Sequence, residues 1–354
     1  MGEIRIGTSG WSYPEGPGTW NGIFYPARRS RSSGRQAKPG DLAYYAEHFD
    51  TVEVNSSFYR PPDPSVTAKW AAGTPRDFDF SLKLYQKFTH PAMYLKAAGR
   101  EPGADESPVP PVTRADVDAF KTALDPLAHA GKLGALLAQF PPSFRDGPDT
   151  REYLAWLLEA FSGYALAVEL RHRSWSDRAG EVLALLEDCA AAWVQIDEPK
   201  FRFSIRQTFA PNVPGIYYMR LHGRNAAKWW THDHPDERYD YLYSPVEIDG
   251  FADTAARVAQ TVHRIYVYMN NHFAGKAVAN AAALRHALGQ PVPGEYAREM
   301  IERYPFLEPY VAHAGGWTLL DGADDRAEAK GATAAKAGWP GGTNTAGDAE
   351  PQEG

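Results

Sequence analysis

The sequence predicts an α/β fold, a single (β/α)₈ TIM barrel, on three observations. Eight short apolar segments each end in polar residues, and most are separated by stretches with helical apolar spacing. The chain has 354 residues, and a barrel of this class uses roughly 250, or more with loop insertions. A hydrophobic content of 44% is enough for a large core. Because active sites of such barrels form at the carboxyl ends of the strands, the polar ends predict where chemistry occurs.

The predicted strands lie within residues 4–11, 51–60, 78–84, 134–140, 166–173, 192–197, 216–223 and 266–272. Capping residues mark several helix starts: Asp41, Asp63 before Pro64, and Thr113 with Asp116. Apolar spacing predicts further helices at 150–161, 178–190, 251–264 and 275–288. Residues 201–211 alternate in character, which predicts an extra strand pair.

We expect the barrel domain to span residues 1–315, with loop insertions near 12–40, 97–111 and 225–245. The first insertion carries a basic run, namely Arg28, Arg29, Arg31, Arg35 and Lys38. Residues 322–354 are rich in Ala, Gly and acids, which predicts a disordered tail. The single cysteine, Cys189, lies in an apolar helical stretch and is expected to be a buried thiol.

Composition narrows the class of partner. The formal net charge is −7, of which the segment from Asp321 onward contributes −4, leaving about −3 for the rest. A nearly balanced body argues against a general polyanion binder, so nucleic acid is not favoured, although a local basic rim remains open. The sequence shows no signal peptide and no membrane-spanning segment, so we expect a cytoplasmic protein without a membrane partner. The oligomeric state is not set by the sequence.

Strand alternation selects the side chains that point into the barrel. It predicts that three acids and four bases converge there: Glu53, Glu169, Asp197, Lys83, Arg171, Arg220 and His222. Charges in a barrel interior are costly unless they are paired or exposed at the mouth. One interpretation is a mutually satisfied salt-bridge network. The other is an acid/base site, whose catalytic candidates are Glu53, Glu169, Asp197, Lys83 and His222.

An anion site is predicted beside the last strand. Gly275 and Lys276 open a helix there, and the free N–H groups of a helix N-terminus favour phosphate, carboxylate or sulfate. Arg220, Arg224 and Lys276 lie there in the strand order. The other polar ligand-binding candidates are strand-end residues, namely Asn55, Arg171, Asn270, Asn271 and His272. Aromatic residues in the loops, among them Trp11 and Tyr59, are suited to stacking on sugars or bases, and equally to packing within a lid.

A divalent metal is an alternative to direct acid/base chemistry. Glu53, Glu169, Asp197, His222 and His272 are residue types that bind Mn²⁺, Zn²⁺ or Mg²⁺. The chain lacks an HxH, HExxH or Cys-pair motif, and the inward Lys and Arg would compete for the acids. We therefore assign no metal ligand and leave the cofactor open.

Seven segments in the same order resemble the YecE-like family, catalogued as domain of unknown function 72. They are residues 6–26, 49–62, 80–90, 133–144, 167–175, 218–225 and 266–281, and the resemblance covers roughly residues 3–290. It implies a TIM barrel and no established activity. The insertions at 27–40 and 97–111 and the acidic tail depart from the family pattern.

Three hypotheses for function follow. The first is an enzyme of hydrolase or isomerase type that binds a small anionic or phosphorylated ligand at the mouth. The second is a metal-dependent phosphodiesterase or nuclease, by fold-level analogy alone. The third is a non-catalytic ligand-binding or scaffolding barrel.

Overall fold

The computed structural model describes residues 1–26, 40–100 and 111–314. The basic run at 28–38, most of the 97–111 insertion and the tail at 322–354 lie outside these ranges. The barrel strands are β1 (Glu3–Ser9), β2 (Thr51–Val54), β3 (Asp79–Lys83), β4 (Leu133–Gln139), β5 (Ala165–Glu169), β6 (Ala191–Trp193), β7 (Gln195–Asp197), β8 (Ile216–Leu221) and β9 (Arg264–Met269).

These strands form one parallel sheet in the order β6-β5-β4-β3-β2-β1-β9-β8-β7. The predicted sixth strand is divided at Val194: β6 pairs with β5, and β7 pairs with β8. A single chain segment therefore brings the two edges of the sheet together, and the sheet forms a nearly closed barrel. The predicted TIM-barrel class is confirmed, and every predicted strand region contains a strand.

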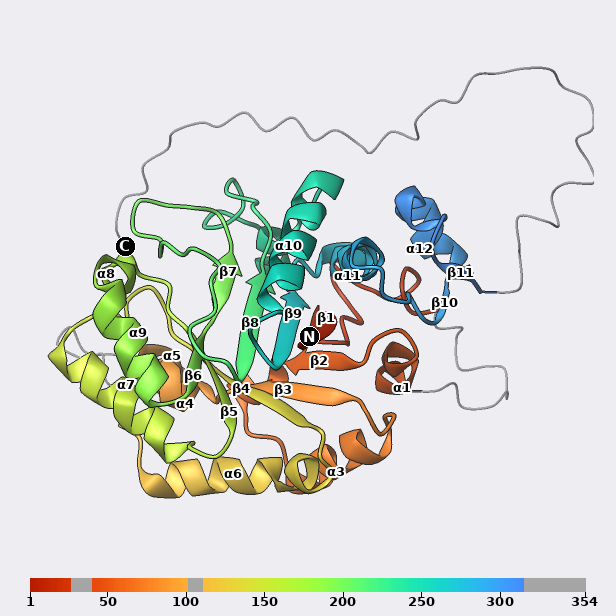
Figure 1. Cartoon of the computed structure of the whole chain (residues 1–354). Helices are drawn as coiled ribbons and strands as arrows, with labels where there is room; N and C mark the ends of the chain where they lie inside the picture. The colour runs from red at the N-terminus through yellow and green to blue at the C-terminus, as the bar shows by residue number, and fades with distance from the viewer. Residues whose placement is uncertain (27–39, 101–110, 315–354) are drawn as a thin grey trace, which may run out of the picture.

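Helices surround the sheet. They are α1 (Asp41–Ala46), α2 (Ser56–Tyr59), α3 (Pro64–Ala72), α4 (Gln86–Thr89), α5 (Pro91–Ala97), α6 (Arg114–His129), α7 (Pro148–Ala160), α8 (Arg173–Asp177), α9 (Ala179–Asp188), α10 (Pro245–Val258), α11 (Lys276–Ala287) and α12 (Arg298–Arg303). Helices α3 and α6 lie side by side, as do α10 and α11 (Figure 1). Short elements complete the chain: η1 (Pro235–Tyr239), η2 (Phe273–Gly275), η3 (Pro305–Leu307), β10 (Glu295–Tyr296) and β11 (Ala312–His313).

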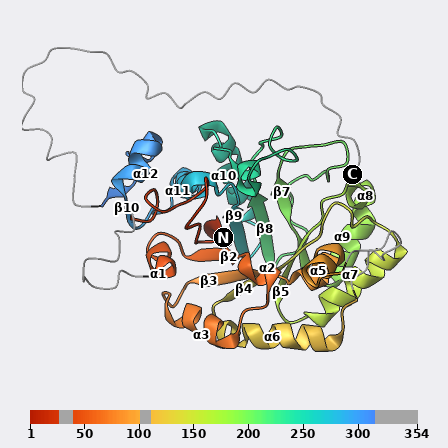
Figure 2. The same cartoon turned by 180° about the vertical axis from the view of Figure 1, so that it is seen from behind.

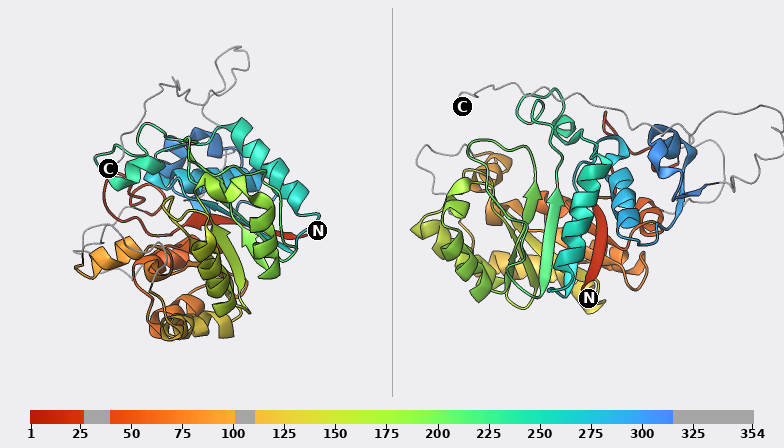
Figure 3. Two further views of the ribbon diagram at one scale, coloured as in Figure 1. Left: turned by 90° about the vertical axis from the view of Figure 1, so that its left-hand side faces the viewer. Right: turned by 45° about the horizontal axis from the view of Figure 1, so that its top comes forward.

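The C-terminal part of the described chain lies outside the barrel wall. Helix α12 and strand β10 lie beyond α11 on the side away from β5 (Figures 1 and 2). The arrows of β7 and β8 point to the upper end in the right panel of Figure 3, where residues 224–244 lie above the strand ends. This end therefore carries the strand carboxyl termini. In the described residues no helix is long and apolar enough to cross a membrane.

Local capping explains the helix boundaries. The Asp63 side chain accepts a hydrogen bond from Ser65 N at the start of α3, as predicted. Asp41 is the first residue of α1 and Gly40 is its N-cap, so the predicted capping role of Asp41 is wrong. The helix predicted at 251–264 begins earlier, at Pro245, because Ser244 and Glu247 form a capping box.

A capping box also starts α6, and Thr113→Ala tests its contribution. Thr113 Oγ1 accepts from Asp116 N, and Asp116 Oδ2 accepts from Thr113 N. We expect the substitution to lower the free energy of unfolding by about 1 kcal/mol in urea titrations. Thr122→Ala is the matched control, since Thr122 is exposed on the same helix and its hydroxyl bonds only the Asp118 carbonyl among the described residues. Equal losses in the two variants would contradict the capping role.

The extra strand pair predicted at 201–211 is wrong. These residues form a loop, and Ser204 in it makes an isolated β-bridge with His172. Gln207 explains the difference, because its side chain donates to Val194 O and accepts from Ile196 N. A side-chain amide thus satisfies backbone groups that a neighbouring strand would otherwise pair. Cys189, expected to be buried, is half-buried after the end of α9.

Candidate functional site

An ion-paired network occupies the barrel interior around Arg220. Arg220 donates to both carboxylate oxygens of Glu53, at 2.9 and 2.7 Å, and to Glu169 Oε2 at 2.5 Å. Tyr218 OH and Ser9 Oγ also donate to Glu53, at 2.7 and 2.8 Å. All five residues are buried, so one guanidinium from β8 forms ion pairs with carboxylates from both β2 and β5.

A second layer lies around Arg171, just beyond the end of β5. Arg171 Nε donates to Glu169 Oε1 at 2.7 Å, and Arg171 Nη1 lies 3.5 Å from Glu198 Oε2. His222 Nε2 lies 3.4 Å from Arg171 Nη2, and His222 Nδ1 lies 2.7 Å from Asn270 Nδ2. We call Glu53, Lys83, Glu169, Arg171, Glu198, Arg220 and His222 the charged cluster.

Burial and neighbouring charges set the protonation of this cluster. Burial alone would raise the pKa of Glu169, but Arg220 and Arg171 outweigh it and hold the pKa well below its ordinary value. Burial and Arg220 lower the pKa of His222 well below its usual range, so the imidazole is neutral. Burial raises the pKa of Glu198, and its Oε2 has no hydrogen-bond partner among the described residues.

Lys83 is the basic member of the cluster without a polar partner. Its Nζ forms no hydrogen bond or ion pair with the described residues and lies 3.8 Å from the centroid of the Phe58 ring. Burial, reinforced by Arg220, lowers the pKa of Lys83 to about 7. The side chain still retains some solvent exposure. A titratable amine with a near-neutral pKa is a recognised mark of functional sites.

Asp197 does not join the cluster, contrary to the sequence prediction. Residues in register on neighbouring strands share a face of the sheet, and Ile196, not Asp197, is in register with Arg220. Asp197 instead accepts hydrogen bonds from Arg224 at 2.8 to 3.0 Å and from Tyr243 OH at 2.8 Å. The inward acid of this segment is Glu198.

The same reversal places Gln195 outside, where its Oε1 accepts from Phe209 N. The prediction failed because it assumed that apolar side chains face the outer helices. On β7 the outer neighbours are the polar Gln207 and the 201–211 loop, so polar residues can face outward. Trp193 and Val168 are in register on the outer face, which is consistent with this direction.

The cations of the predicted anion site are not brought together. Arg220 lies inside the barrel, Arg224 pairs with Asp197 and Glu247, and Lys276 pairs with Asp240. Helix α11 does begin after Gly275, whose φ of 81° favours glycine. Since carboxylates already neutralise these cations, the arrangement does not support an anion pocket at this helix start.

The remaining ligand-binding candidates divide between the cluster and its surroundings. Asn270 contacts His222, whereas Asn271 donates to Tyr241 O and to Asn280 and so holds the loop above the strands. His272 is buried and stacks on Tyr13 with ring centroids 4.2 Å apart. The others lie apart: Trp11 packs against Trp70, Asn55 is half-buried before α2, and Tyr59 is 66% exposed.

Sequence reasoning missed Glu198, Tyr218 and Ser9. Tyr218 could have been found, because it precedes Arg220 by two residues and therefore shares its face. Ser9 is in register with Glu53 on β1, which also follows from alternation. Glu198 was not predicted, because an alternation that points Asp197 into the barrel points its neighbour Glu198 outward. Among the described residues no group of three His, Cys, Asp or Glu side chains could hold a metal ion.

Fold and site together define a parallel (β/α)₈ barrel with a buried charged cluster at the carboxyl ends of its strands. The comparison with protein families places this chain more narrowly. It belongs to the family described as protein of unknown function DUF72, whose model matches residues 5–300.

Similar proteins cover most of the chain. The UPF0759 protein YunF of Bacillus subtilis is 27% identical over 305 residues, which is 84% of this chain and 99% of YunF. The crystal structure of a DUF72 family protein from Thermotoga maritima has 30% sequence identity and a TM-score of 0.65, covering 81% of this chain and all of that one. A DUF72 family protein from Enterococcus faecalis has 24% identity and a TM-score of 0.67, covering 81% and 95%.

Proposed function

We propose that the protein is an enzyme acting on a small anionic carbonyl compound, phosphorylated or carboxylated, at the charged cluster. The observation that carries this proposal is the amine of Lys83, which lies inside the barrel and has a pKa of about 7. Roughly half of such an amine is neutral at pH 7, against fewer than about 1 in 1,000 for an ordinary lysine. A neutral amine is the nucleophilic form.

The charge balance of the cluster supports an anionic ligand. Two guanidiniums, Arg171 and Arg220, balance the carboxylates of Glu53 and Glu169. When it is protonated, Lys83 adds a positive charge that forms no ion pair with a carboxylate among the described residues. A phosphate or carboxylate on the ligand would balance that charge in a buried setting.

The chemistry available to Lys83 is addition to a carbonyl. The nitrogen lone pair forms a bond to the carbonyl carbon as the C=O π bond breaks, the nitrogen releases one proton, and the carbonyl oxygen takes up a proton to give a hydroxyl. A second proton then lets that oxygen leave as water, and the product is a protonated Schiff base. Glu198 is the candidate proton donor, because burial raises its pKa and its Oε2, 3.5 Å from Arg171 Nη1, has no hydrogen-bond partner among the described residues.

Trapping tests this proposal directly. Intact protein is incubated with pyruvate or dihydroxyacetone phosphate and borohydride, and peptides are then analysed by mass spectrometry. We expect a reduced adduct on Lys83 that is absent from Lys83→Arg and retained in Lys228→Arg, whose lysine pairs with Glu237 at the surface. In parallel, dimethylation with ¹³C-formaldehyde reports the pKa of Lys83 by NMR, which should be about 7.

Two results would contradict the proposal. One is a Lys83 amine that titrates near the ordinary lysine value. The other is trapping that spreads over surface lysines and is unchanged in Lys83→Arg. A compound that is converted by the wild type and by Lys83→Arg at the same rate would remove Lys83 from the mechanism.

A further inference from the structure

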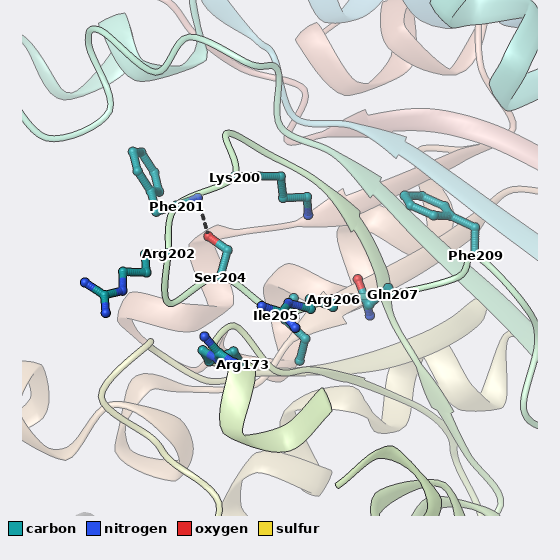
Figure 4. A pocket seen from close by; sticks show the side chains of 9 residues that line it. All are labelled: Arg173, Lys200, Phe201, Arg202, Ser204, Ile205, Arg206, Gln207 and Phe209. Atoms are coloured by element: carbon teal, nitrogen blue, oxygen red, sulfur yellow. Dashed lines mark hydrogen bonds between the residues drawn. The ribbon is translucent and has the colours of Figure 1, made fainter. Parts of the chain in front are cut away.

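We propose that a groove beside the 201–211 loop binds single-stranded nucleic acid, a function separate from the charged cluster. The groove has a volume of about 380 Å³ and is lined in part by Arg173, Lys200, Phe201, Arg202 and Arg206 (Figure 4). Phe203 and Trp230 adjoin it through their contacts with Phe201. We call these seven residues the basic-aromatic groove.

The groove is positively charged although the whole chain is acidic. Residues 200–213 contain three bases, Lys200, Arg202 and Arg206, and no acid. Arg202 and Arg206 are exposed, and neither has an ion-pair partner in the part of the chain that the structure describes. Arg173 pairs with Asp177 at 3.0 Å. Two unneutralised guanidiniums on one short loop are suited to successive phosphates of a backbone.

The aromatic residues offer faces on which unpaired bases can stack. Phe201 and Phe203 are stacked, with centroids 5.7 Å apart and planes at 13°. Trp230 lies 5.7 and 6.1 Å from these two rings and is 51% exposed. The adjacent Trp229 is only 6% exposed, so of these two indole rings the accessible one is that of Trp230, beside the groove. Single-strand binders combine such rings with a basic track along the backbone.

The loop is held in place before any ligand arrives. Ser204 Oγ accepts from Phe201 N at 2.9 Å, as the dashed line in Figure 4 shows. Arg173 N donates to Phe203 O at 2.8 Å, and Ile205 N donates to Arg171 O at 2.9 Å. Arg206 N donates to Ser176 Oγ at 3.1 Å. Such preorganisation lowers the entropic cost of binding.

Single-stranded ligand is favoured over duplex because duplex bases are already stacked and present edges and phosphates rather than faces. On a duplex, the rings of Phe201, Phe203 and Trp230 would find no exposed base face on which to stack. A mononucleotide would use one ring and one phosphate group, whereas the groove places three rings and two free guanidiniums in one region. The observations therefore point to a chain of nucleotides.

Fluorescence polarisation with labelled oligo(U) of roughly 12 nucleotides, within the range of known single-strand sites, tests the proposal. The probes for comparison are a duplex of equal length, heparin and UMP. We expect Trp230→Ala to weaken oligo(U) binding roughly 5- to 150-fold and Trp230→Phe to retain most of it. The double variant Arg202→Ala/Arg206→Ala should lower the slope of log K against log salt by about 1.4.

Arg298→Ala is the matched control, because Arg298 is an exposed arginine on α12 outside the barrel wall. It should bind oligo(U) as the wild type does. Absence of oligo(U) binding at low salt would overturn the proposal. So would equal affinity for duplex or heparin with no effect of Trp230→Ala, which would indicate general electrostatic attraction, or UMP binding as tight as oligo(U), which would indicate a mononucleotide site.

Discussion

Replacement of Arg220 by methionine is expected to lower the free energy of unfolding by about 3–5 kcal/mol. The guanidinium is buried and bonds both oxygens of Glu53 and one oxygen of Glu169. Methionine has a similar length but leaves both carboxylates without their main counter-charge. The measurement is equilibrium unfolding in urea at pH 7, with linear extrapolation to water.

The pH dependence separates this electrostatic effect from a packing effect. In the wild type Arg220 helps to hold the folded-state pKa of Glu169 below its unfolded value, so the stability that this pairing contributes is present above the unfolded pKa and is lost as pH falls towards the folded pKa. The gap to wild type should therefore narrow towards acid pH. Arg298→Met, at a residue whose side chain is 85% exposed, should change stability by less than about 0.5 kcal/mol. A gap that is constant with pH would contradict the account.

Lys83→Met is expected to stabilise the protein at pH 7, on the order of 2–4 kcal/mol after allowance for residual exposure and the lost contact with Phe58. The folded-state pKa of Lys83, about 7, lies below the ordinary value of 10.5. Between these values the unfolded chain binds more protons than the folded one, so wild-type stability rises with pH relative to the variant. The advantage of Lys83→Met should shrink from pH 7 to pH 10.

Unfolding of both proteins at several pH values gives this difference. Buried tyrosines such as Tyr218 and Tyr268 have raised pKa values, so they lower stability above about pH 10 in both proteins and cancel in the comparison. Lys69→Met, an exposed lysine on α3, should show no comparable change between pH 7 and 10. If Lys83→Met were less stable than the wild type at pH 7, the protonated amine would be stabilised by its surroundings. The lowered pKa that supports Lys83 as a nucleophile would then be contradicted.

The fold was predictable because its signals are local and repeated. Each strand is a short apolar run, and capping residues such as Asp63 and Thr113 fix helix starts within one turn. Where the prediction failed, at 201–211, alternation was present but Gln207 replaced the missing strand by bonding the backbone itself. Side-chain-to-backbone bonds across many residues leave no periodic trace in a sequence.

The candidate site was predictable only in part. Alternation found Glu53, Lys83, Glu169, Arg220 and His222, because their outer neighbours are apolar. It chose Asp197 over Glu198, because parity on that strand depends on the outer loop and not on a helix. The sequence also did not predict that Arg224 and Lys276 pair with acids in residues 197–247. These ion pairs depend on how the loop of residues 224–244 lies over the strands.

The division of the sixth strand at Val194 has a consequence for the choice between these two acids. Residues before the break take their register from β5, and residues after it take theirs from β8. A slip of one residue moves every side chain of a strand to the opposite face. Pairing with β5 before the break and with β8 after it therefore fixes the same alignment of this segment. That alignment keeps Glu198, and not Asp197, in contact with Arg171.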